Sequence, residues 1–151
     1  MFHVEQLHKK IMKISGRIVD IHRRSIYSGA VRFEDGRIID VVEEEHGEKK
    51  YIMPGLIDAH VHIESSMLTP YAFAQTASAH GTVGCVSDPH EIANVLGVEG
   101  VEYMIESARE SKMRFWFGAP SCVPATIFES SGAAIGAGEV RRLLENPGVK
   151  Y

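Results

Sequence analysis

Two histidines separated by one residue, His60 and His62, are the residues whose types and spacing point most directly to chemistry. They lie near the end of an apolar segment at 51–63 (YIMPGLIDAHVHI), which contains a Pro-Gly pair. Successive side chains of a β-strand point to opposite faces, so the two imidazoles point the same way and can ligate one cation. We therefore predict that His60 and His62 are metal ligands.

A second polar group, Asp88, His90 and Glu91, directly follows the apolar segment at 81–88 (GTVGCVSD). A histidine beside a glutamate can contact a substrate, ligate a metal or support another ligand, and the residues alone leave all three roles open. In the structural alternative, Asp88 forms a bend before Pro89 and Glu91 favours the start of a helix.

Glu64 and Ser65 follow the histidine pair and form a third, weaker set of site residues. Their position after the same apolar segment predicts that they lie near the two histidines. The structural alternative is that they cap a helix, which serine and glutamate often do in loops.

The elements that must position these residues alternate between strands and helices. Thr69 and Pro70 form the start signal of a helix and Gly81 the stop signal. The predicted strands and helices are strands at 51–63, 81–88 and 114–119 and helices at 70–79, 98–112 and 136–146, with a fourth strand opening near 148–151. This alternation predicts a parallel sheet.

The first 50 residues have a different texture. Residues 1–10 are polar and aperiodic and are read as a tail, whereas 11–50 hold three segments rich in Ile and Val. Asp35-Gly36 between two of these segments predicts a tight hairpin, because glycine accepts the positive φ of such a turn. We interpret 11–50 as a β-sandwich segment.

The predicted fold class is α/β: the N-terminal part of a (β/α)8 TIM-like barrel, preceded by the small β-sandwich segment. A closed barrel needs about 250 residues, so residues 51–151 hold about three of its eight units. The chain is therefore expected to be the N-terminal fragment of a larger enzyme. The alternative is a complete small domain with an open sheet.

The composition is typical of a globular protein, with 44% hydrophobic and 24% charged residues. A net charge of −4 without a basic block argues against a nucleic-acid or anionic-membrane partner. No segment approaches the roughly 18 apolar residues of a membrane span. Cys85 and Cys122 lie far apart in apolar stretches, which favours a reducing, cytoplasmic setting, and Cys85 is expected in the core.

The segment PGLIDAHVH, residues 54–62, resembles the first-strand metal motif of the amidohydrolase superfamily. Three further blocks are similar to the bacterial adenine deaminase family, in the same order: HIESSMLTP, DPHEIANVLG and SCVPAT. The resemblance covers residues 14–151. It implies a metal-dependent hydrolase with a (β/α)8 barrel and a small flanking β-sandwich.

The resemblance also implies a reaction, a cofactor and a partner. A binuclear centre of manganese or iron, or alternatively zinc, would make hydroxide from water. Hydroxide would attack C6 of adenine, release ammonia and leave hypoxanthine, a step of purine salvage. His60 and His62 match two metal ligands, and the others are expected beyond Tyr151, so the fragment alone is expected to be inactive.

Within that resemblance, His90 and Glu91 are expected to be catalytic. Glu64, Ser65 and Asp88 are expected to bind the substrate. An unpaired sheet edge and an uncovered barrel interior predict self-association into a homo-oligomer.

Three other functions were weighed. One zinc deaminase class combines H-x-E with P-C-x-x-C, and His62-Ile63-Glu64 satisfies the first half, but the second half is absent. An amidohydrolase acting on a cyclic amide fits the histidine pair equally well. The non-enzyme alternative is a truncated chain that binds metal weakly or serves as a subunit.

Overall fold

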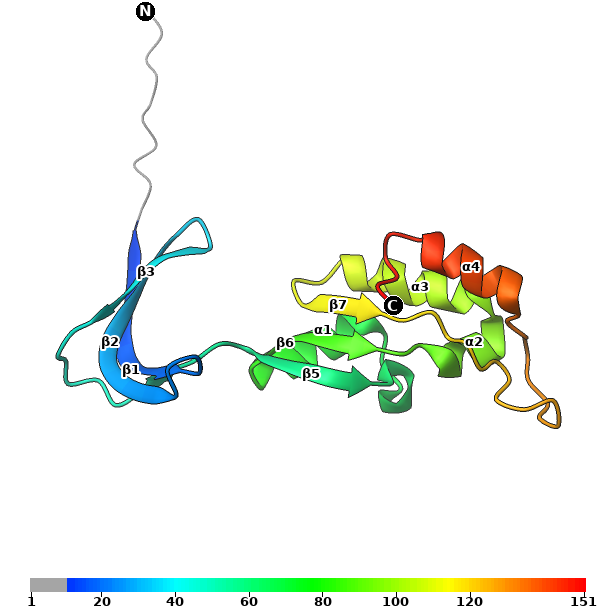
Figure 1. The fold of residues 1–151 in the computed structure, drawn as a ribbon, viewed down its shortest axis with the longest axis horizontal. Coiled ribbons are helices and arrows are strands. Elements are labelled where there is room, and N and C mark those ends of the chain that lie inside the picture. The colour runs from blue at the N-terminus through cyan, green and yellow to red at the C-terminus, as the bar shows by residue number, and fades with distance from the viewer. Residues whose placement is uncertain (1–10) are drawn as a thin grey trace, which may run out of the picture. The chain divides into compact units, whose positions relative to one another are not determined.

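The structure of this chain is a computed structural model that describes residues 11–151; the predicted tail, residues 1–10, lies outside the described part. The chain divides into two compact units, one ending at Pro54 and the other spanning Gly55–Tyr151. Figure 1 traces both units along the chain. No helix within the described residues is long and apolar enough to cross a membrane.

The first unit is a four-stranded sheet with the order β3-β2-β1-β4. Three strands pair antiparallel, as predicted: β1 (Met12–Asp20), β2 (Ser25–Glu34) and β3 (Arg37–Glu43). The turn between β2 and β3 has positive φ at both central residues, 50° at Asp35 and 74° at Gly36. The predicted hairpin is confirmed.

The sequence placed Tyr51 and Ile52 at the start of the first barrel strand, and this was wrong. They form β4 (Tyr51–Ile52), which pairs in parallel with β1 in the first unit. The apolar segment is interrupted at Pro54 and Gly55, so its two halves join different sheets. The described residues of this unit form one sheet, and a second layer that would make it a sandwich stays a prediction.

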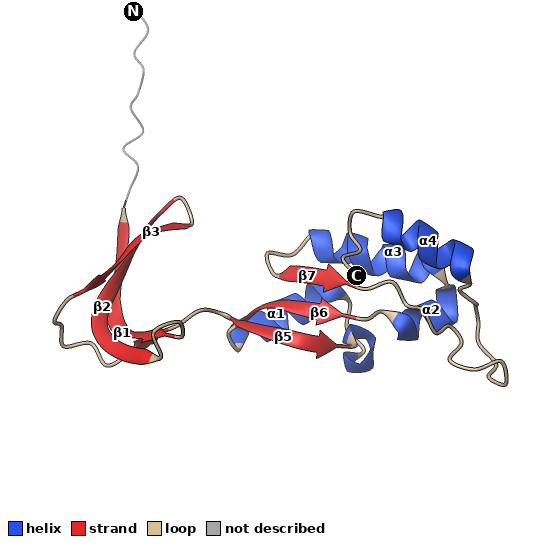
Figure 2. Ribbon diagram, in the orientation of Figure 1, coloured by secondary structure: helices blue, strands red, loops and turns tan. Residues whose placement is uncertain are grey.

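The second unit is built on a parallel sheet with the order β5-β6-β7. Figure 2 shows its three strands running in one direction with helices between them. The elements in chain order are β5 (Leu56–Val61), the 3-10 helix η1 (Ile63–Ser66), α1 (Pro70–Ala79), β6 (Thr82–Ser87), α2 (His90–Leu96), α3 (Val98–Arg109), β7 (Arg114–Phe117) and α4 (Ala137–Glu145). Val149 then pairs in parallel with Phe117, as expected at the start of a fourth strand.

Helix α1 begins and ends as the sequence predicts. The hydroxyl of Thr69 accepts a hydrogen bond from the Ala72 amide at 3.4 Å, and Pro70 is the first helical residue. His80 is the C-cap, and Gly81 follows with a φ of 90° that favours glycine.

Residues 90–96 were predicted as loop, and they form α2 instead. Seven residues make about two turns, too few for a helical period to stand out in the sequence. Gly97, with a φ of 63°, separates α2 from α3, so two helices follow each other with a sharp change of direction. The structural alternative for this segment, in which Glu91 lies in the first turn of a helix, therefore describes the backbone correctly.

The core of the second unit lies between its helices and one face of the parallel sheet. Helix α3 contributes Val101, Met104 and Ile105, which pack in one cluster with Phe117 and Cys85. Burial of each large apolar side chain is worth about 1.5–3 kcal/mol. Cys85 is fully buried, as expected of a core residue, and burial together with the charge of Asp58 raises the pKa of its thiol to about 12.

The three parallel strands form an open sheet and do not close into a barrel. Leu56 and Ile57 of β5 are 52% and 58% exposed, which is unusual for the apolar residues of a parallel strand. The open sheet and these exposed side chains are compatible with the first units of a larger barrel.

Helices α2 and α3 approach closely at Gly100, and this contact yields a prediction. A Cβ at Gly100 would lie 2.9 Å from the Ile92 carbonyl oxygen and 3.1 Å from the Leu96 Cβ. We expect Gly100→Ala to lower the free energy of unfolding by about 1–3 kcal/mol because α2 must shift, although alanine favours helix by about 1 kcal/mol. Urea unfolding followed by circular dichroism measures the change.

The matched control is Gly138→Ala in α4, where a Cβ would meet no heavy atom within 4 Å. This substitution should leave stability unchanged or raise it by up to about 1 kcal/mol. Equal gains in stability from both substitutions would contradict the close contact between α2 and α3.

Candidate metal centre

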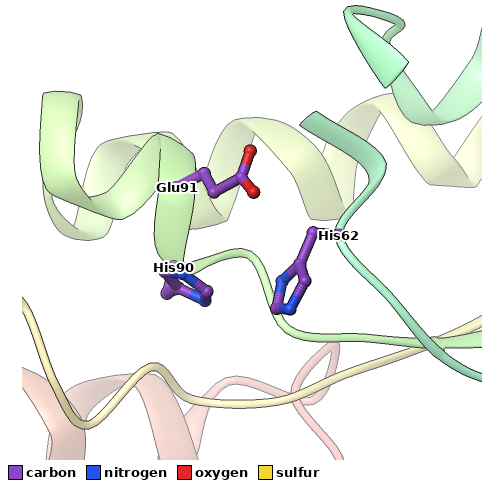
Figure 3. A group of neighbouring side chains, drawn as sticks. All are labelled: His62, His90 and Glu91. Carbon is purple, nitrogen blue, oxygen red and sulfur yellow. The ribbon is translucent and has the colours of Figure 1, made fainter. Parts of the chain in front are cut away.

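The site lies at the carboxyl ends of β5 and β6, which meet at one edge of the parallel sheet. His60 is in β5 and His62 directly follows it, whereas His90 and Glu91 open α2 after β6. Figure 3 shows the imidazole of His62 coming from the segment after β5 and the side chains of His90 and Glu91 coming from the first turn of α2. Two connections of the sheet therefore bring together residues 28 or more positions apart.

The two histidines of the H-x-H pair are placed to share one cation. Their Nε2 atoms are 3.1 Å apart. Two nitrogens bound to one metal at about 2.1 Å are separated by about 3.0–3.4 Å when the angle between them is octahedral or tetrahedral. The observed separation fits this range without rearrangement.

A hydrogen bond selects which nitrogen of His62 faces the cation position. Nδ1 of His62 lies 2.8 Å from the backbone carbonyl oxygen of Asp88. A carbonyl only accepts, so Nδ1 must carry the proton and donate it, and Nε2 keeps a free lone pair. Histidine ligands of metals are commonly oriented by such a contact at their second nitrogen.

His62, His90 and Glu91 also form a group that can hold a cation. One ligand atom from each lies within 4.8 Å of the others, and the rings of His62 and His90 meet edge to face at 4.5 Å. Two imidazoles and a carboxylate suit zinc, manganese and iron, the metals that accept mixed nitrogen and oxygen ligands. The donor set of this site therefore fits the metals expected from the sequence.

Asp88 orients both imidazoles. Its carbonyl accepts from His62, and its carboxylate Oδ2 lies 3.1 Å from Nδ1 of His90. Its amide in turn donates to the Val61 carbonyl at 3.4 Å, which joins the ends of β5 and β6. Asp88 was predicted to bind the substrate; that role stays a prediction.

Glu64 and Ser65 face α2. The Glu64 carboxylate accepts a hydrogen bond from the Ile92 amide at 3.2 Å, and the Ser65 hydroxyl donates to the Glu91 carboxylate. Both were predicted to bind the substrate, and this also stays a prediction. The structure gives the side chains of both residues partners within the protein.

Two residues that support the site were missed in the sequence. The side-chain amide of Asn94 donates to the His90 carbonyl at 3.0 Å, and the Tyr151 hydroxyl donates to the Ser87 carbonyl at 3.2 Å. Burial raises the pKa of the Tyr151 hydroxyl, with smaller contributions from the charges of Asp88 and Cys85. An asparagine in an assumed loop and a terminal tyrosine carry no periodic or motif signal that would have identified them.

Comparison with known proteins adds three findings. The model of the amidohydrolase family matches residues 51–146. The chain is 56% identical over 138 residues to an adenine deaminase of Salinibacter ruber, covering 91% of this chain and 25% of that protein. It is 54% identical over 139 residues to an adenine deaminase of Methanosarcina mazei, covering 92% and 25%.

A third relative, an adenine deaminase of Parabacteroides distasonis, is 51% identical over 142 residues, covering 94% of this chain and 26% of that protein. The chain thus spans about a quarter of the length of the curated relatives that it matches.

The histidine pair yields a direct prediction about metal binding. We expect the chain to bind Mn²⁺, and His60→Asn or His62→Asn to weaken that binding by at least about tenfold, since even changes to residues behind the ligands cost that much. Calorimetric titration with Mn²⁺ measures the affinities. The control is His80→Asn at the end of α1, which should leave the affinity unchanged. Equal affinities for all variants would exclude His60 and His62 as ligands.

Proposed function

The chain belongs to the amidohydrolase family, and from that membership we propose that it forms the first part of a metal-dependent deaminase that converts adenine and water into hypoxanthine and ammonia. The observation that carries the proposal is the pair of facing Nε2 atoms of His60 and His62, 3.1 Å apart at the carboxyl end of β5. Active sites of (β/α)8 barrels are built at this end of the strands.

The proposed role of His60 and His62 is to hold one of two cations, manganese or iron in the first place and zinc as the alternative. A divalent cation held there would lower the pKa of a water molecule to about 7 and so supply hydroxide at neutral pH. The carbonyl of Asp88 keeps His62 in the tautomer that ligates through Nε2. This part of the proposal is supported by the donor set and by the family match.

His90 and Glu91 are proposed to act on protons during the reaction. Hydrolysis forms a C6–O bond, breaks the C6–N bond and requires that a proton reach the departing amine. A carboxylate near the cation can accept a proton from water and deliver it to nitrogen. Glu91 fits this role because its carboxylate lies within 4.8 Å of the ligand atoms of His62 and His90.

Adenine is proposed as the substrate because the relatives at 51–56% identity are adenine deaminases. The match spans more than nine tenths of this chain, including the segments that carry His60, His62, His90 and Glu91. A cyclic amide would be the substrate in a different amidohydrolase, and the test below includes one.

A chimera tests the proposed activity. This chain would replace the matching quarter of the Methanosarcina mazei relative, and the purified protein would be loaded with Mn²⁺ and assayed for ammonia release. We expect adenine to be deaminated and a cyclic amide such as dihydrouracil to be left intact. A folded, metal-loaded chimera that opens the cyclic amide and leaves adenine unchanged would refute the proposed substrate.

The chain by itself is expected to release no ammonia from adenine. His60, His62, His90 and Glu91 offer too few ligands to hold two cations. The exposed apolar residues of β5 and the open sheet edges should also drive self-association into a homo-oligomer. A monodisperse monomer in sedimentation that turns over adenine would overturn the interpretation as part of a barrel.

Glu91→Gln separates catalysis from folding. In the chimera at saturating Mn²⁺, we expect kcat to fall by about 100-fold, in the range typical for loss of a general acid or base. The melting temperature should stay within a few degrees, because Glu91 contacts Ser65 at the protein surface. A large loss of stability with unchanged kcat would instead assign Glu91 a purely structural role.

A further inference from the structure

Helix α2 carries His90 and Glu91, and its own residues do not cap its first turn. Its N-cap is Pro89, which has no side-chain oxygen and makes no capping hydrogen bond. The amides of a first turn need partners from outside the helix. For Ile92, that partner is the Glu64 carboxylate, 28 residues earlier in the chain.

Glu64 and Ser65 both belong to η1, which directly follows His62. This turn is held firmly, because Ile63 is fully buried in the core and the Ser66 hydroxyl donates to the Ile63 carbonyl at 2.6 Å. The Ser65 amide donates to the His62 carbonyl at 3.2 Å. A rigid turn attached to one histidine ligand thus makes two hydrogen bonds to the first turn of α2.

The energetics of these contacts argue against a role in stability alone. One carboxylate oxygen of Glu64, Oε2, is buried without a hydrogen-bond partner among the described residues. Burying a carboxylate oxygen without a partner costs free energy. The contact from Ser65 to Glu91 is exposed, and exposed polar contacts to charged groups add little to stability.

We propose that Glu64 and Ser65 are positioning residues: Glu64 fixes the first turn of α2, and Ser65 fixes the Glu91 carboxylate, so that Glu91 faces a cation held by His62. The chemical meaning of this arrangement rests on the proposed function. The two hydrogen bonds themselves are independent of it.

Amide hydrogen exchange tests the role of Glu64 without metal or activity. In the whole chain, Glu64→Ala should speed exchange of the Ile92 amide by at least about tenfold, as expected when a hydrogen-bonded amide loses its acceptor. Glu64→Gln keeps an acceptor oxygen and should restore slow exchange. Ser66→Ala, in the same turn but bonded to Ile63, is the matched control and should leave Ile92 unchanged.

A double-mutant cycle on Mn²⁺ affinity tests the role of Ser65. We expect Glu91→Gln to weaken Mn²⁺ binding about tenfold and Ser65→Ala to weaken it about threefold, because supporting residues typically tune affinity by such factors. If Ser65 acts through Glu91, adding Ser65→Ala to the Glu91→Gln chain should have no further effect. A purely structural Ser65 would weaken binding equally in both backgrounds.

The outcomes distinguish this proposal from the proposed function. Unchanged exchange of Ile92 in Glu64→Ala overturns the role of Glu64, and independent effects of Ser65→Ala and Glu91→Gln overturn that of Ser65. A wild-type chain that binds no Mn²⁺ refutes both the metal chemistry and the role of Ser65, while the exchange rate of Ile92 still decides the role of Glu64. Inactivity of the chimera toward adenine bears on the substrate alone.

Discussion

The hydrogen bond from Nδ1 of His62 to the carbonyl of Asp88 is the contact on which the site depends. It joins the end of β5 to the end of β6, and it decides that Nε2 of His62 is the nitrogen free to bind a cation. Because Asp88 also meets His90 through its carboxylate, one residue sets the orientation of both rings. The donor geometry follows from the pairing of two parallel strands, and the cation chemistry follows from that geometry.

The short helix α2 makes the arrangement possible, and its position is determined from three sides. Gly100 lets α3 pack against the Ile92 carbonyl at close range, Glu64 receives the Ile92 amide, and the Asn94 carbonyl accepts from the amides of Gly132 and Ala133 in the segment after β7. A seven-residue helix has little intrinsic stability, so such tertiary contacts must hold it in place. The placement of Glu91 near His62 is therefore a property of the packed unit.

Sequence reasoning succeeded where the signal is local. The H-x-H pair on a strand, the Thr69-Pro70 start of α1 and the Asp35-Gly36 hairpin each depend on a few adjacent residues, and the structure has the predicted geometry at each. It failed where tertiary contacts decide: α2 is too short to show a period, and β4 joins the first sheet because of its pairing with β1. A backbone carbonyl such as that of Asp88 leaves no trace in the residue pattern, since every residue has one.

The most direct measurement is nitrogen-15 NMR of the histidine side chains in the whole chain during titration with Zn²⁺, a diamagnetic cation suited to the same donors. The account predicts that the Nε2 signals of His60 and His62 shift together at the first equivalent while Nδ1 of His62 stays protonated. The contradicting result is a chain in which the signals of both histidines stay unchanged, or in which Zn²⁺ displaces the proton from Nδ1 of His62.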